Sequence, residues 1–222
     1  MDADAVGTDT DTASTATLNI VIALFEDFTA LDAIGPYEVL RMLPGARVTF
    51  AAAERGIVRT DSRMVGLSAD AAFDEIGSAD SLVVPGGRGT RAAMRDEPVL
   101  SWVRAVHATT QWTTSVCTGS LVLAGAGLLE GLDATTHWGA TELLEKQGAR
   151  YTPQRVVRQG KIITAAGVSA GIDMALTLAA HVAGEPVAKA IQLAIEYDPQ
   201  PPFDAGSPAK AGPEILAVNA TL

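Results

Sequence analysis

The chain has 222 residues, 48% hydrophobic and 19% charged, which is ample for one large domain with a full core. Its net charge of −10 argues against a nucleic-acid partner, because phosphate binding needs clustered Lys and Arg. One cysteine excludes an internal disulfide, no apolar run is long enough to span a membrane and no signal peptide is recognisable, so we expect a cytoplasmic protein.

Residues 1–17 are almost free of large apolar side chains, and we expect a disordered tail there, followed by a single domain over residues 18–222. Apolar or β-branched runs predict strands at 18–25, 47–53, 81–84, 112–116 and 134–137, a hairpin or irregular excursion at 57–68, and a hairpin over 155–164. Helical periodicity predicts helices at 37–42, 98–109, 120–129, 140–147, 171–183 and 187–196, the first with Pro36 in its opening turn. Residues 198–222 are expected to wrap the surface without regular structure.

Alternating strands and helices predict an α/β fold with a mostly parallel central sheet and helices on both faces. In such a sheet, the loops after the strands converge on one edge. Four of these loops carry the candidate residues: 26–36, the turn at Gly86 and Gly87, the loop at Cys117, and 165–171 with Gly167 and Val168.

The only cysteine, Cys117, falls where a β-branched strand gives way to a Leu- and Ala-rich helix. A tight turn there would present the side chain above a helix N-terminus, as in a nucleophile elbow. The free N–H groups of the helix would then lower the pKa of the thiol from about 8.5 toward neutrality. The alternative is a buried cysteine that acts as a small hydrophobe. We interpret Cys117 as the nucleophile.

A thiolate needs an acid or base close by, and Asp32 lies in an otherwise apolar segment at the same sheet edge. A half-buried carboxylate there would hold a raised pKa and could exchange a proton with the thiol. The alternative role for Asp32 is an N-cap of the helix that contains Pro36.

The remaining candidates are supporting residues. The glycine-rich turn lacks the spacing of a phosphate loop, and it either presents N–H groups to an anion or is a plain turn. His137 could complete a Cys-His dyad, although a histidine hydrogen-bonded in the core or at an interface is the more common case. Phe203 could line a pocket or a dimer contact. Neither the histidines nor the carboxylates show metal-ligand spacing, so we expect no metal and no organic cofactor.

Two motifs around the cysteine, residues 115–120 (SVCTGS) and 134–138 (ATTHW), resemble the ThiJ/PfpI superfamily of glutamine-amidotransferase-like proteins. Residues 31–36 (LDAIGP), 85–87 (PGG), 170–173 (AGID) and 201–208 (PPFDAGSP) make the chain most similar to the isocyanide hydratase branch of that superfamily. The likeness covers about residues 18–208.

The resemblance implies a flavodoxin-like α/β/α sandwich, a homodimer, and hydration of an isocyanide (isonitrile) to an N-substituted formamide through a cysteine thioimidate. Carried over by position, Cys117 would be the nucleophile and Asp32 the general acid and base. We expect the backbone N–H groups of Gly87 and Thr118 to polarise the intermediate, with Gly86, Gly167, Val168, His137 and Phe203 as further pocket residues.

The chain departs from two branches of the superfamily. Protease-like members place His directly after the nucleophile, where this chain has Thr118, so peptidase activity is not expected. Related regulators attach a helix-turn-helix domain, for which this chain leaves no room. Two other hypotheses stay open: a glyoxalase or deglycase-type stress enzyme acting on 2-oxoaldehydes, and a sensor whose thiol responds to oxidants or ligands.

Overall fold

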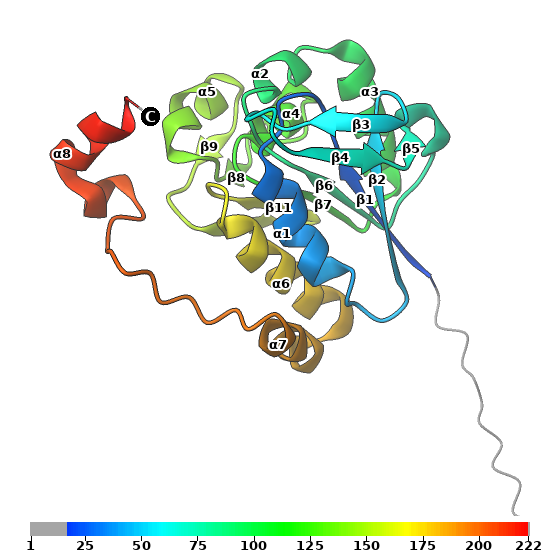
Figure 1. The fold of residues 1–222 in the computed structure, drawn as a ribbon. Helices are drawn as coiled ribbons and strands as arrows, with labels where there is room; N and C mark the ends of the chain where they lie inside the picture. Colours follow the sequence, from blue (N-terminus) through cyan, green and yellow to red (C-terminus); the bar gives the residue numbers. More distant parts are fainter. Residues whose placement is uncertain (1–16, 222) are drawn as a thin grey trace, which may run out of the picture.

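The computed structural model describes residues 17–221, so the tail expected over residues 1–17 lies almost wholly outside the described part. Within that part, a seven-stranded sheet has the order β10-β11-β7-β6-β1-β2-β5 (Figure 1). Each neighbouring pair is parallel except β10 and β11, which form the second expected hairpin. The strands are β1 (Leu18–Ala23), β2 (Ala46–Ala52), β5 (Ala71–Ala72), β6 (Ser81–Val84), β7 (Trp112–Ser115), β10 (Val156–Gln159) and β11 (Ile162–Ala165).

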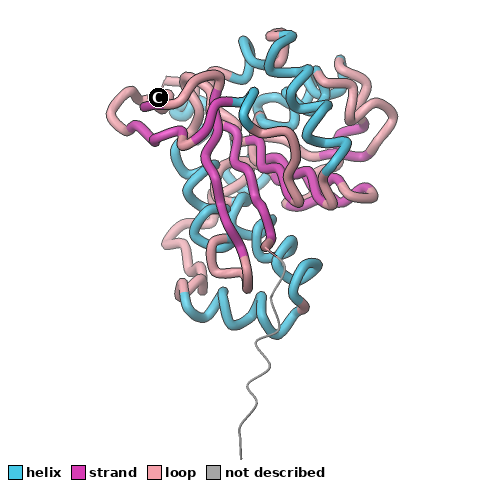
Figure 2. The backbone as a smooth tube through the Cα atoms, turned by 90° about the vertical axis from the view of Figure 1, so that its right-hand side faces the viewer, coloured by secondary structure: helices cyan, strands magenta, loops and turns pink. Residues whose placement is uncertain are grey.

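Helices cover both faces of this sheet, as the turned view in Figure 2 shows. One face carries α1 (Ala30–Leu40), α6 (Ala170–Ala183) and α7 (Glu185–Ala194). The other carries α2 (Thr90–Ala93), α3 (Glu97–Thr109), α4 (Gly119–Gly125) and α5 (Thr141–Lys146). Side chains of β1 alternate between the two cores: Ile20 and Ile22 face the first layer, and Val21 and Ala23 face the second. The expected flavodoxin-like three-layer sandwich is confirmed.

Several short elements lie outside the seven-stranded sheet. Strands β3 (Gly56–Arg59) and β4 (Gly66–Ala69) are antiparallel, so the region around residues 57–68 is a hairpin and not an irregular excursion. The strand expected at 134–137 is shorter, because β8 (Asp133–Ala134) pairs only with β9 (Arg150–Tyr151). Two 3-10 turns, η1 (Phe73–Glu75) and η2 (Trp138–Ala140), complete this set. Among residues 17–221, no helix has the length and apolar character that crossing a membrane requires.

Two predictions about the helices were wrong. Helix α1 begins at Ala30, so Pro36 lies inside the helix and not in its first turn. Residues 198–222 are not irregular throughout, because α8 (Pro208–Asn219) follows an extended segment that leaves the body after α7 (Figure 1). The physical reason is that Pro208 and Pro213 each suit the opening turn of a helix, and non-helical Gly212 (φ 74°) joins the two short helices that result.

Small residues bring α1 and α6 together beside the strand that precedes the cysteine. A Cβ atom added to Gly171 would lie 3.0 Å from the Val116 side chain and 3.4 Å from Cδ of Pro36. A Cβ atom on Gly35 would lie 3.2 Å from the Ile172 side chain. The two helices therefore carry Asp32 and the loop before α6 to the carboxyl edge of β7, where Cys117 lies.

Candidate active site

Cys117 lies at a sharp turn between β7 and α4, as the sequence predicts. Its backbone has a positive φ of 55°, which is unfavourable for a residue with a side chain. Hydrogen bonds hold this conformation: the Cys117 N–H donates to the carbonyls of Ala166 (2.9 Å) and Ala165 (3.1 Å). The hydroxyls of Thr136 (3.1 Å) and Ser120 (3.2 Å) donate to the Cys117 carbonyl. The elbow is therefore fixed on both sides of the cysteine.

Asp32 lies against this elbow, in the first turn of α1, and is fully buried. Its Oδ2 atom accepts a hydrogen bond from the Gly86 N–H at 2.9 Å. A methyl group on Gly86 would lie 2.8 Å from both Asp32 Oδ2 and Cys117 Cβ, so the three residues meet at one point. Among the described residues, Asp32 Oδ1 has no hydrogen-bond partner. This oxygen is free to carry and exchange a proton.

The two side chains perturb each other's pKa. Burial raises the pKa of Asp32 from 3.8 to about 7; hydrogen bonds from the Gly86 N–H and the Cys117 thiol oppose this rise, and the negative charge of Asp61 adds to it. Burial, together with the charge of Asp32, also raises the pKa of Cys117 to about 11. The raised Asp32 pKa agrees with the sequence prediction. The prediction of a lowered thiol pKa was wrong, because Cys117 is only 5% exposed and burial outweighs the N–H groups that favour the thiolate.

The raised pKa of Asp32 predicts a pH-dependent effect on stability. The folded state holds the Asp32 proton more tightly than the unfolded state does, so this stabilisation is complete below about pH 4 and is lost as the pH rises through about 7. Asp32→Asn removes the buried charge, and we expect it to be more stable than wild type at pH 8 by at most about 4 kcal/mol. Urea unfolding at pH 4 and pH 8 measures this; an equal stability difference at both pH values would contradict it.

Backbone N–H groups surround the sulfur, although not all of those expected. The amides of Val168 and Thr118 both face the Cys117 thiol and favour its ionised form. The Gly87 N–H, an expected donor to the reacting atoms, instead donates to the Thr118 hydroxyl at 3.0 Å. That hydroxyl also contacts the Thr90 hydroxyl at 3.1 Å. The Gly87 N–H is therefore bound to the Thr118 side chain, and the Val168 N–H, which was not among the expected donors, faces the sulfur.

Gly86 is the position where a side chain would do most damage to the site. An added Cβ would approach the Thr118 nitrogen to 2.6 Å, besides its contacts with Asp32 and Cys117. We expect Gly86→Ala to destabilise the fold by about 1–3 kcal/mol, because overpacking forces the surrounding backbone to move. Thermal unfolding measures this. Gly77→Ala is the matched control, since nothing lies within 4 Å of its Cβ position. Equal melting temperatures for the two variants would contradict the prediction.

His137 supports the loop before α6 and makes no hydrogen bond to the cysteine among the described residues. A Cβ on Gly167 would lie 2.8 Å from the His137 ring, so the ring packs against that loop. Its Nδ1 atom accepts a hydrogen bond from the Gly139 N–H at 3.1 Å, which places the ring proton on Nε2. Burial and the charge of Arg91 lower the pKa of His137 and so favour the neutral ring. The expected pocket residues Gly167 and His137 therefore lie together, beside Val168.

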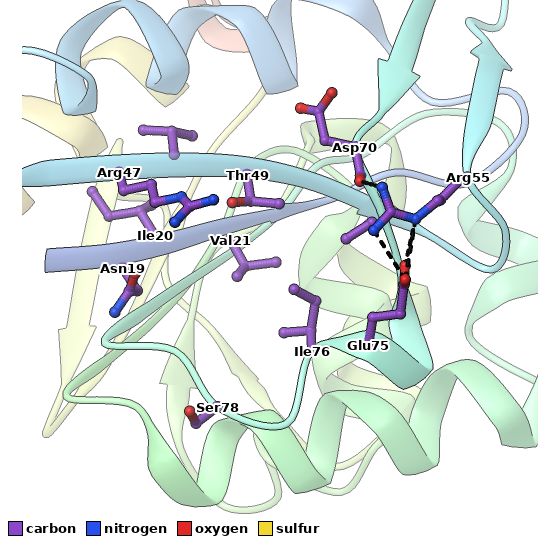
Figure 3. A pocket seen from close by; sticks show the side chains of 12 residues that line it. Asn19, Ile20, Val21, Arg47, Thr49, Arg55, Asp70, Glu75, Ile76 and Ser78 are labelled. Carbon is purple, nitrogen blue, oxygen red and sulfur yellow. Dashed lines mark hydrogen bonds and ion pairs between the residues drawn. The ribbon is translucent and has the colours of Figure 1, made fainter. Parts of the chain in front are cut away.

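Phe203 lies apart from this group. It is 79% exposed in the extended segment between α7 and α8. A cavity of about 430 Å³ also lies away from the predicted site, over the first halves of β1 and β2 (Figure 3). Two of its charged side chains pair with each other: Arg55 makes a two-point ion pair with Glu75, and it also donates to the backbone carbonyl of Asp70. None of the residues predicted to react lines that cavity.

No three His, Cys, Asp or Glu side chains in residues 17–221 are grouped so that they could hold a metal ion. The site brings a thiol and a carboxyl group into direct contact, with backbone N–H donors around the sulfur. Such a set can add the sulfur to a small electrophile and move the protons that the addition requires.

Two hydroxyls that hold the elbow were not predicted. Ser120 and Thr136 lie within the two motifs around the cysteine, yet nothing in their spacing indicates that both bind the Cys117 carbonyl. Their small, polar character in an otherwise apolar region was the available signal. Both are fully or almost fully buried, which is the setting where a hydroxyl must find a partner.

Comparison with known proteins agrees with this geometry. Residues 18–181 match the model of the DJ-1/PfpI family. The isonitrile hydratase of Pseudomonas putida is 44% identical over 199 residues, which are 90% of this chain and 87% of that protein. A deglycase of Pyrococcus furiosus is 26% identical over 66% of this chain and 89% of its own length.

Among solved structures, a ThiJ/PfpI family protein from Pseudomonas syringae superposes with a TM-score of 0.87 at 34% identity. The superposition covers 99% of this chain and 93% of that one. The resemblance seen in the cysteine motifs is thus confirmed by sequence and by fold, and the chain belongs to the DJ-1/PfpI family.

Proposed function

We propose that this protein is an isocyanide hydratase, which converts an isocyanide and water to an N-substituted formamide. The observation that carries the proposal is the buried pair of Cys117 and Asp32, a thiol and a carboxyl group with one unpartnered oxygen. The relative named isonitrile hydratase supports the same reaction, since 44% identity extends over 90% of this chain.

In the first half of the reaction, the Cys117 proton moves to the Asp32 carboxylate as the sulfur attacks the terminal carbon of the isocyanide. The Val168 and Thr118 N–H groups face the sulfur and stabilise its negative charge as the proton leaves. The new C–S bond leaves a lone pair on the same carbon, and Asp32 returns the proton there. The product is a thioimidate, R–N=CH–S–Cys117, with Asp32 ionised again.

In the second half, Asp32 takes a proton from water while the hydroxide adds to the thioimidate carbon. The proton then passes to the nitrogen, which gives R–NH–CH(OH)–S–Cys117. The C–S bond breaks as the hydroxyl proton is lost, so that the formamide leaves and the thiol is restored. A carboxyl group with a pKa of about 7 suits both directions of transfer at neutral pH.

Because little of the thiol is exposed, the site favours an electrophile of small cross-section. Cys117 is only 5% exposed and Asp32 is fully buried. An isocyano group is linear and ends in the reacting carbon, so it can reach a recessed sulfur without a bulky neighbour. The raised pKa of the thiol also favours attack that is coupled to proton transfer over reaction of a free thiolate.

The proposal is tested by incubating the protein with an alkyl isocyanide such as cyclohexyl isocyanide and following the N-substituted formamide by mass spectrometry. With H₂¹⁸O, the formamide oxygen should carry the label, because water supplies it in the second half of the reaction. A protein that folds and yet forms no formamide above the buffer rate would rule the function out.

A second candidate is a glyoxalase or deglycase-type enzyme acting on 2-oxoaldehydes, favoured by the 26% identical deglycase of Pyrococcus furiosus. Parallel assays with methylglyoxal and an isocyanide separate the two by their kcat/KM values. A role as a thiol sensor gains less support, because a thiol with a pKa of about 11 is largely protonated at pH 7 and reacts slowly with peroxide.

We also propose a homodimer, with α1 and the β3–β4 hairpin at the contact between the two copies. Leu31, adjacent to Asp32, is 40% exposed, and Ile57 and Met64 of the hairpin region are 60% and 84% exposed. Large apolar side chains that are exposed at the surface are candidates for burial in an interface. Analytical ultracentrifugation of the wild type and of Met64→Lys tests this, since a charge at the contact should shift the equilibrium to monomer.

A further inference from the structure

We propose that Arg155 is a positioning residue, which holds the Val168 N–H against the sulfur of Cys117. Arg155 does not touch the thiol and acts through the loop between β11 and α6. The inference rests on the proposed role of Cys117 as the nucleophile, and it concerns what keeps a strained donor in place.

The donor belongs to a strained backbone. Val168 has a φ of 29°, in the left-handed region that a β-branched residue rarely adopts. Its N–H nevertheless faces the Cys117 sulfur and favours the ionised thiol. Strain of this kind persists only where the surroundings hold the residue from several sides. The neighbouring Ala166 carbonyl already accepts from the Cys117 N–H at 2.9 Å, so any movement of this loop also reaches the elbow.

Arg155 contacts the loop on both sides of Val168. Before it, the Ala166 N–H donates to the Arg155 carbonyl at 2.9 Å. After it, Nη2 of Arg155 donates to the Ser169 hydroxyl at 3.2 Å, and Nε pairs with the carboxylate of Asp173 in the first turn of α6. One residue thus fixes the chain two positions before Val168 and one position after it.

The geometry of the contact requires an arginine. The guanidinium is a planar fork, so binding Asp173 through one nitrogen aims another at Ser169. A lysine at position 155 could keep the charge pairing but could not supply the second, fixed direction. Ser169 makes no capping hydrogen bond to its own helix, so its hydroxyl is available to Arg155.

Global stability does not account for this arrangement. The side chains of Arg155 and Asp173 are 52% and 30% exposed, and ion pairs so exposed contribute little to folding. The same two side chains also contact the phenol of Tyr197, which lies near the start of the segment that follows α7. The cluster therefore links the loop, α6 and the start of the segment that follows α7.

The test uses the rate of Cys117 alkylation by iodoacetamide in the full chain, from pH 6 to pH 10. Cys117 is the only cysteine, so alkylation reports one site and needs no knowledge of the substrate. Arg155→Ala and Ser169→Ala should each slow alkylation at pH 7.5 by about fivefold to tenfold and move the pH profile upward, because the thiolate loses a donor. Arg155→Lys should resemble Ser169→Ala.

Arg158→Ala is the matched control. Arg158 lies three residues away on β10, where it donates to the Gly160 carbonyl and stacks on Trp112, and its loss should leave the alkylation profile unchanged. If Arg155→Ala fails to fold, Ser169→Ala still tests the proposal. Unchanged or faster alkylation in the Arg155 and Ser169 variants would overturn the proposal, as would full wild-type behaviour in Arg155→Lys. If isocyanide turnover is absent while alkylation slows as expected, the proposed function fails and the positioning role stands.

Discussion

Replacing Cys117 with serine is expected to lower isocyanide turnover by on the order of 10⁴-fold or more, with no loss of fold. A serine hydroxyl is nearly the size of the thiol but is a far weaker acid and nucleophile. Burial beside Asp32, which already raises the pKa of the thiol to about 11, would disfavour an alkoxide still more strongly. Formamide production per hour, measured at high enzyme concentration, gives the residual rate.

Cys117→Ser is also a clean comparison, since the positive φ at this position costs serine the same strain as cysteine. Its melting temperature should lie close to that of the wild type. Cys117→Ala should be equally inactive. If either variant kept more than about one tenth of the wild-type rate, a mechanism through a cysteine thioimidate would be excluded.

Asp32→Asn is expected to lower turnover by about 10²-fold to 10⁴-fold, the usual contribution of a positioned acid and base. An amide of the same shape can keep the Gly86 N–H contact through its oxygen, but it cannot carry the thiol proton to the substrate carbon. The gain in stability expected for this variant at pH 8 excludes misfolding as the cause of the loss.

Alkylation measures the reactivity of the Cys117 thiol separately from proton transfer by Asp32. Loss of the Asp32 charge removes one of the causes that raise the thiol pKa, so Cys117 in Asp32→Asn should react with iodoacetamide at least as fast as in the wild type. Asp61→Asn is the control, since Asp61 raises the Asp32 pKa and pairs with the Thr29 hydroxyl at 2.7 Å. It should keep turnover within about fivefold. Comparable activity in Asp32→Asn and Asp61→Asn would show that Asp32 transfers no proton.

The sequence was sufficient to predict the architecture because each layer has a local signature. The apolar run that became β1 and the change of pattern at Cys117 are readable without a partner strand. Helix α1 was predicted too short because Pro36 resembles a helix start, and only the packing of α1 against α6 shows that the helix passes through it. Helix α8 was missed because a Pro- and Gly-rich composition usually indicates a loop.

At the active site, the sequence was sufficient to predict which residues lie there. It was not sufficient to predict the direction of the thiol pKa shift or the acceptor of each N–H group. The sequence brings Asp32 and Cys117 to one sheet edge, but the sign of the thiol pKa depends on burial, which no local pattern reports. The Gly87 amide was expected to face the reacting atoms, yet a hydroxyl in the next loop accepts it. Arg155 gave no signal at all, since its contact with Ser169 joins residues 14 positions apart.

Two backbone N–H groups, those of Val168 and Thr118, face the sulfur of Cys117 beside the Thr118 hydroxyl. Every amino acid except proline carries a backbone N–H, so the side chain at position 168 can change without removing a donor that faces Cys117. Variation at this position would then alter the shape that a substrate must fit and leave the reacting group intact. A hydratase and a deglycase could arise from one ancestral scaffold in this way, by exchange of side chains around an unchanged turn.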